Sequence, residues 1–331
     1  MKKMKKLLAG FMAATMVMSM SVTAFADETT YEDMSTIKLT KTYKETNDGT
    51  TSPAETFEFS DLTCTGVKDA GVGVTAENAP VPTIANVEYA AGEAGSETAT
   101  KEIVIRLPEY NAVGIYTYTF TETDGNTAGV TYRSDAIKLV VTVIEQDGKV
   151  RVAALHTEEE GEAKSNAIDN EYSAGSLSVK KEVTGILGDK TKDFTVKVTF
   201  TAPEGDTVRE AISYTDGTET KTIEAGWDTT AEATITLKHE ETVTFTNIPY
   251  GVTYTVVEDD YTGDGYDAAE YAFDDENKEI NSATENVKIT NNKDGNVDTG
   301  ISLDNMPYIM VLALVALGLV GFVSKKRSME F

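Results

Sequence analysis

Short runs of alternating apolar and polar residues fill the chain between Glu28 and Asn292, and no stretch there has the spacing of an amphipathic helix. A repeat of two residues is typical of a strand with one buried face, whereas a helix with one buried face repeats every 3.6 residues. Asp-Gly pairs at 48–49, 124–125, 147–148 and 216–217 mark turns between the runs. The pattern predicts an all-β protein with many short strands.

The expected strands form two groups on either side of residues 171–175, where the alternation breaks. They are 36–43, 57–62, 101–107, 113–122, 136–146 and 149–155 in the first group, and 176–184, 193–202, 232–238, 242–247, 252–258 and 286–291 in the second. Strands this short and frequent favour β-sandwiches. We therefore expect two tandem immunoglobulin-like domains, 27–172 and 173–293.

A polar residue continues an apolar row in three segments of each group, in the same order both times. These residues are Lys41, Glu122 and Asn170 in the first group, and Lys181, Glu258 and Asn291 in the second. Because side chains two positions apart share a face, each would point toward the core. The neighbours Lys180 and Asn292 are of the right type, but the alternation places them on the opposite face.

An amine, a carboxyl and an amide inside a core each cost several kcal/mol if they stay charged or unpaired. Burial lowers the pKa of a Lys and raises that of a Glu, so both neutral forms become accessible. A neutral amine is a nucleophile, and a protonated Glu can polarise the amide carbonyl and shuttle protons as ammonia leaves. The product would be a Lys–Asn isopeptide bond. The alternative is that these residues form ordinary salt bridges at solvated strand ends.

The beginning of the chain has the features of a secretory signal peptide. Basic residues at 2–6 precede an apolar run from Leu7 to Met20, and Ala24-Phe25-Ala26 supplies a small-x-small cleavage pattern. We expect residues 1–26 to be this signal peptide. An uncleaved membrane helix is the alternative, although the run is short for a membrane span.

The end of the chain, 294–331, combines a pentapeptide, an apolar run at 306–323 and a basic tail. The run is long enough to span a membrane, and Lys325, Lys326 and Arg327 would stay cytoplasmic. With Asn296, Val297, Asp298, Thr299 and Gly300 ahead of it, this order resembles a Gram-positive cell-wall sorting signal. The resemblance implies cleavage by a sortase between Thr299 and Gly300. Asn and Val replace the Leu and Pro of the usual motif, which leaves the sortase class open, and an ordinary tail-anchored membrane protein is the alternative.

Most of 36–293 resembles the streptococcal T-antigen-type backbone pilins, whose tandem CnaB-like domains carry Lys–Asn isopeptide bonds assisted by Glu. The segments that carry the resemblance are 37–43, 114–122, 168–170, 177–185, 251–260 and 287–293. The resemblance implies a Lys41–Asn170 bond with Glu122 as the assisting acid, and a Lys181–Asn291 bond with Glu258. The match is better in the second domain than in the first.

The resemblance also implies a fimbrial backbone subunit that a sortase polymerises and attaches to peptidoglycan at the cell surface. Its partners would be the sortase and identical subunits, and it would meet the membrane only through the C-terminal helix of the precursor. In the resembled pilins, an acceptor lysine lies shortly before the Asn of the first domain. Lys164 is the candidate here, with an ordinary surface lysine as the alternative.

Composition excludes several other classes of protein. The formal net charge of −26 argues against a nucleic-acid partner, and one Cys with two His excludes an internal disulfide and nearly excludes a Cys/His zinc site. We expect no metal, no cofactor and no enzymatic activity. The remaining alternative is a wall-anchored adhesin that binds a ligand and never polymerises.

Overall fold

The computed structural model describes residues 34–95, 99–158 and 166–295, which form strands and one short 3₁₀ turn, Thr262–Asp264. The all-β prediction is confirmed for this part of the chain. Within it, no helix is long and apolar enough to cross a membrane. The signal peptide, Lys164, the sorting pentapeptide and the span at 306–323 lie outside the described residues.

The first half of the chain, up to Tyr172, forms three sheets. Its strands are β1 (Thr36–Glu45), β2 (Glu55–Phe57), β3 (Thr63–Lys68), β4 (Thr83–Ile84), β5 (Val87–Tyr89), β6 (Ala99–Arg106), β7 (Gly114–Phe120), β8 (Ile137–Gln146), β9 (Lys149–Glu158) and β10 (Ala167–Tyr172). Two four-stranded sheets have the orders β10-β1-β6-β4 and β3-β7-β8-β9, and β2 pairs with β5. Residues from all three sheets join one buried apolar cluster, which includes Leu39, Phe57 and Tyr118.

The second half forms two sheets. Its strands are β11 (Ala174–Thr184), β12 (Phe194–Thr201), β13 (Ile212–Asp216), β14 (Glu219–Ile223), β15 (Thr230–Leu237), β16 (Thr242–Pro249), β17 (Thr253–Glu258), β18 (Glu270–Phe273) and β19 (Thr284–Asn292). The sheet orders are β14-β13-β16-β11-β19-β18 and β15-β12-β17. Both sheets contribute to a second buried cluster, with Val179, Val198 and Phe245 among its members.

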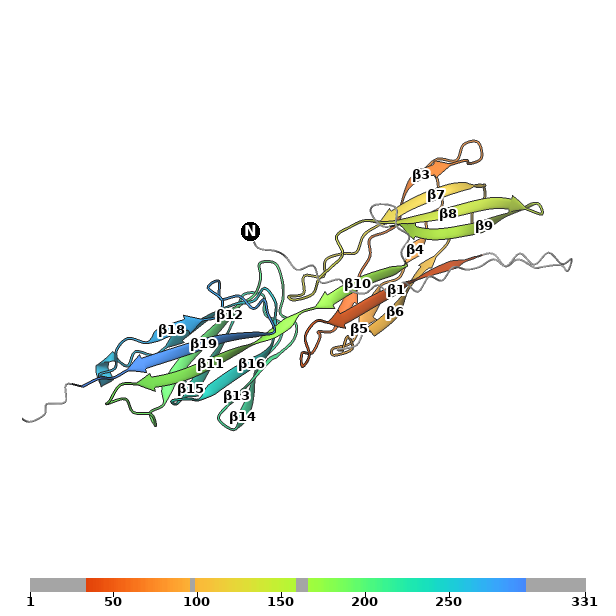
Figure 1. The fold of residues 1–331 in the computed structure, drawn as a ribbon. Coiled ribbons are helices and arrows are strands. Elements are labelled where there is room, and N and C mark those ends of the chain that lie inside the picture. Colours follow the sequence, from red (N-terminus) through yellow and green to blue (C-terminus); the bar gives the residue numbers. More distant parts are fainter. Residues whose placement is uncertain (1–33, 96–98, 159–165, 296–331) are drawn as a thin grey trace, which may run out of the picture. The chain divides into compact units, whose positions relative to one another are not determined.

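In each half the first and last strands lie side by side and run parallel (Figure 1). Asn170 of β10 stands opposite Tyr43 of β1, two residues beyond Lys41. Asn291 of β19 likewise stands opposite Val183 of β11, two residues beyond Lys181. A two-residue offset keeps side chains on the same face of a sheet, so each Lys and Asn share a face.

The strand predictions differ from the structure in two ways. The expected strand 57–62 is shorter, because regular pairing covers Glu55–Phe57 and then continues only as an isolated bridge at Phe59. The strands β3, β4, β5, β13, β14 and β18 were not predicted. Each has six residues or fewer, which is too short for an alternation of apolar and polar positions to be clear.

Candidate functional site

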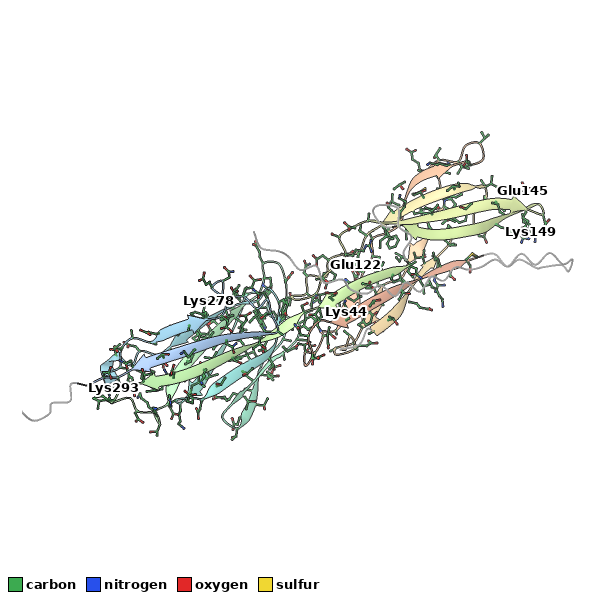
Figure 2. All side chains as sticks on the ribbon, viewed as in Figure 1. Lys44, Glu122, Glu145, Lys149, Lys278 and Lys293 are labelled. Carbon is green, nitrogen blue, oxygen red and sulfur yellow. The ribbon has the colours of Figure 1, made fainter. Side chains whose placement is uncertain are left out.

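The first cluster brings together Lys41, Glu122 and Asn170 from three separate segments. Lys41 lies in β1, Asn170 in β10, and Glu122 follows β7, where it pairs with Phe59 in an isolated bridge. All three are buried, and the Lys41 and Asn170 residues are fully so. The polar side chains therefore complete apolar rows inside the first half of the chain. Glu122 is labelled in Figure 2.

Contacts in this cluster link every pair of groups. The Lys41 ammonium donates to Glu122 Oε1 at 2.6 Å and also to Asn170 Oδ1. The Asn170 amide donates in turn to Glu122 Oε2 at 2.9 Å. The amine therefore lies against the carboxamide that it would attack, and the acid contacts both reactants.

Backbone groups of the segment after Glu122 complete the first cluster. The Arg133 N–H donates to Glu122 Oε2 at 2.7 Å, and the Asn170 amide donates to the Thr131 carbonyl at 2.7 Å. These contacts fix the orientation of the carboxylate and of the amide nitrogen, which is the leaving group in bond formation. These backbone contacts could not be predicted from the sequence, because a loop backbone has no periodicity.

The second cluster places Lys181 of β11, Glu258 of β17 and Asn291 of β19 together. The Lys181 and Glu258 side chains are fully buried, with Nζ 3.2 Å from Glu258 Oε1. Lys181 also donates to Asn291 Oδ1. Among the described residues, no donor reaches either carboxylate oxygen of Glu258 with hydrogen-bond geometry, so this acid lacks the backbone partner that Glu122 has.

An aromatic ring covers each amine. Lys41 Nζ lies 4.0 Å from the centre of the Phe57 ring, and Lys181 Nζ lies 4.3 Å from that of Phe194. The rings exclude water, while their π faces offset part of the cost of a buried cation. The alternation did not identify these rings as parts of the clusters, although Phe57 and Phe194 both stand in apolar rows.

Burial changes the proton affinities in the direction that the chemistry needs. It lowers the pKa of the Lys41 amine to about 8, with Glu122 opposing part of the shift. It also lowers the pKa of Lys181 and raises that of Glu258. A neutral amine and a protonated acid are therefore easier to reach here than in water.

The neighbouring residues of the same type lie outside the clusters. Lys180 is about half exposed and pairs with Glu240 at 2.6 Å. The Asn292 amide accepts a hydrogen bond from Thr184 and donates to Asp267. The face assignment from the alternation agrees with both positions.

Two further buried acids lie on apolar rows, and no lysine in the described part of the chain contacts either one. Glu55, on the row of Phe57 and Phe59, accepts a hydrogen bond from Thr127 Oγ1 at 2.6 Å. Glu285, on the row of Val287, accepts one from Ser282 at 2.6 Å. The row pattern that identified Glu122 also marks these acids, so it indicates burial rather than chemistry.

Both halves of the chain match families of known proteins. Residues 37–173 match the family described as Spy0128-like isopeptide containing domain. Residues 175–293 match a family described only as a domain of unknown function, DUF7601. The first half is thus similar in sequence to an isopeptide-containing domain.

The relatives that cover most of the chain are pilins. A curated pilin from Streptococcus pyogenes serotype M1 is 29% identical over 256 residues, which cover 71% of this chain and 74% of the relative. The crystal structure of the major pilin from Streptococcus pyogenes is 25% identical, with a TM-score of 0.53, and covers 80% of this chain and all of that one. The T-13 major pilin of the same species shares the fold at 20% identity and a TM-score of 0.51, covering 80% of this chain and 98% of that one. The resemblance to streptococcal backbone pilins is confirmed.

Proposed function

We propose that this protein is a structural pilus subunit of the backbone type, stiffened by two internal isopeptide bonds. The observation that carries the proposal is the contact of a buried Lys with a buried Asn between the first and last strands of both halves. The confirmed similarity to pilins supports the same conclusion. Bond formation occurs once within each molecule, so the protein is not an enzyme.

The chemistry follows from the groups in each cluster. A proton passes from the Lys ammonium to the Glu carboxylate, which leaves a neutral amine against the Asn carboxamide. The amine attacks Cγ, and the protonated Glu gives its proton to the leaving nitrogen, which departs as ammonia. The Glu carboxylate then takes up the proton that the attacking nitrogen loses, so the acid ends protonated beside a neutral amide. One C–N bond forms and one breaks, and the buried charges disappear.

The position of the bonds suits a chain that carries load. We propose two tandem immunoglobulin-like domains, 27–172 and 173–293, with only Ser173 between β10 and β11. A pull that enters β1 would pass through Lys41–Asn170 into β10, continue into β11, and pass through Lys181–Asn291 into β19. Covalent bonds would then carry the force that parallel-strand hydrogen bonds carry otherwise.

The experiment that tests the bonds is the intact mass of the secreted body, residues 27–299. Each bond releases one ammonia, about 17 Da, so the mass should lie about 34 Da below that of the sequence. A mass equal to that of the sequence would reject both bonds. A deficit of about 17 Da would reject one of them, and peptide mapping would show which.

Polymerisation by a sortase at Thr299–Gly300, attachment to peptidoglycan and a role for Lys164 as acceptor belong to the same proposal. Surface extracts boiled in detergent and probed by antibody test this part. A ladder of high-mass species is expected from a polymer. A single band near the size of the monomer would favour the wall-anchored adhesin instead.

A further inference from the structure

The loop between β11 and β12 exposes two large apolar side chains next to each other. Ile186 is 66% exposed and Leu187 is 54% exposed. Covering a solvent-exposed aliphatic pair with a partner is favourable, because it removes apolar surface from water. Single exposed apolar residues are common on protein surfaces and need no such explanation. The position of the pair in the fold therefore decides whether it is a candidate docking surface.

The same loop forms hydrogen bonds with the segment that follows β19, which we call the exit segment, 293–295. The Leu187 N–H donates to the Lys293 carbonyl at 3.0 Å, and the Lys293 N–H donates to the Thr184 carbonyl at 3.1 Å. The Ile186 N–H donates to Asp294 Oδ1 at 3.2 Å. Lys293 directly follows the end of β19 (Figure 2). These hydrogen bonds therefore position the exit segment beside Ile186 and Leu187.

A glycine makes this close approach possible. Gly185 has a φ of +85°, and a Cβ added there would lie 2.3 Å from the Lys293 carbonyl oxygen. Any other residue would push the loop away from the exit segment. The exit segment also contacts the loop at Gly295, the last described residue, which packs against the Leu187 side chain.

The remaining length of chain limits what can cover the pair. Thr299 lies four positions beyond Gly295, and four extended residues span at most about 14 Å. Whatever is joined to the Thr299 carbonyl is therefore held within that reach of the fixed exit. A folded protein attached by so short a connection has its surface beside Ile186 and Leu187.

We propose that the loop 185–188 is a docking surface for a second copy of this chain, the copy whose amine is joined to Thr299. This inference rests on the proposed function, since it needs a polymer. The covalent bond joins the two subunits, and the apolar contact fixes how one is oriented on the other.

Cysteine labelling in pili sheared from cells tests the docking. Leu187→Cys is compared between the purified monomer and the polymer, with Val257→Cys as the control, because Val257 is 58% exposed and lies on β17 rather than in the loop. The parent protein contains one cysteine, Cys64, so its labelling is measured separately and subtracted from that of each variant. We expect maleimide labelling at position 187 to be at least roughly tenfold slower in the polymer, and labelling at position 257 to be unchanged.

The outcomes separate the docking from the proposed function. A normal ladder with equal labelling of position 187 in monomer and polymer would overturn the docking and leave the function standing. Slower labelling at both positions would also overturn it, because the protection would not be specific to the loop. Absence of a ladder from the parent protein would overturn the proposed function and the docking with it.

Discussion

At the scale of single residues, the buried lysines differ from their neighbours in having an acid, an amide and a ring around the amine. Lys41 and Lys181 have fully buried side chains, whereas Lys180 pairs with Glu240 on the surface. A buried ion pair stabilises a fold weakly, because desolvation offsets the attraction. Conversion of the amine to an amide would remove this desolvation cost. The proposed bond therefore explains why these polar residues lie in the core.

The assisting acid of the second cluster can be tested alone. Glu258→Ala removes the group that contacts the Lys181 amine, so we expect the mass deficit to fall from about 34 to about 17 Da. Glu182→Ala is the matched control, because that acid pairs with Lys288 outside the cluster, and its deficit should stay near 34 Da. An unchanged deficit in Glu258→Ala would show that Glu258 is not needed.

The first cluster predicts a pH dependence that only an uncrosslinked protein can show. In Asn170→Ala the Lys41 amine remains, and its folded-state pKa of about 8 lies below the ordinary 10.5. The unfolded state then binds more protons between these values, so the free energy of unfolding rises with pH across that window. With the proposed bond, the wild type would have an amide there and should lack the rise.

Denaturant unfolding at pH 7.5, 8.5 and 9.5 measures this difference. Burial raises the pKa of several tyrosines in the folded state, and the same tyrosines begin to titrate near the upper end of the range once unfolded, so the quantity to compare is the free energy of unfolding of the variant minus that of the wild type. Parallel curves for the two proteins would contradict the prediction.

At the scale of elements, the parallel pairing of first and last strands decides where a bond can form. β1 pairs with β10, and β11 with β19, so the proposed bonds would join segments that are far apart in sequence. Lys181 and Asn291 are 110 residues apart. A bond between them closes a long loop and restricts the unfolded chain in the manner of a disulfide.

The loop length gives the expected size of the effect. Asn291→Ala should lower the free energy of unfolding of the second half by about 5 kcal/mol, the entropy of closing a loop of this length. Lys180→Ala is the control, because its side chain is exposed on the same strand. Chemical denaturation of both variants measures the loss, and an Asn291→Ala midpoint equal to that of the wild type would reject a stabilising bond.

Alternation could predict the strands that carry the clusters, but not everything around them. It distinguished Lys181 from Lys180, because one residue of register moves a side chain to the other face. It could not separate Glu122 from Glu55, since both continue apolar rows and only the paired strand decides which acid meets a lysine. Arg133 and Thr131 act through backbone groups, which carry no residue-specific signal at all.

At the scale of the whole molecule, the two bonds would leave little chain that a pull can extend. Lys41 and Asn170 are 129 residues apart, and all of that chain is bypassed when the bond is present. The same holds between Lys181 and Asn291 in the second half. The wild type should therefore resist extension until covalent bonds break.

Force spectroscopy on a single molecule measures this directly. Lys41→Ala releases the bypassed chain, so we expect one extension step of roughly 430–460 Å less the folded distance. Lys38→Ala is the control, because Lys38 is exposed on the same strand and pairs with Glu102. A step of that size in the control or in the wild type would show that the bond does not carry the load.

Both clusters use one geometric relation, an Asn opposite the second residue beyond a Lys on an adjacent parallel strand. The relation depends on strand spacing and register rather than on the surrounding sequence, which differs between the halves. It can therefore be grafted: a scaffold whose terminal strands run parallel needs only a lysine beneath an aromatic ring, an asparagine at that offset and a facing glutamate. Such an engineered staple would form without an added catalyst and, unlike a disulfide, would survive reducing conditions.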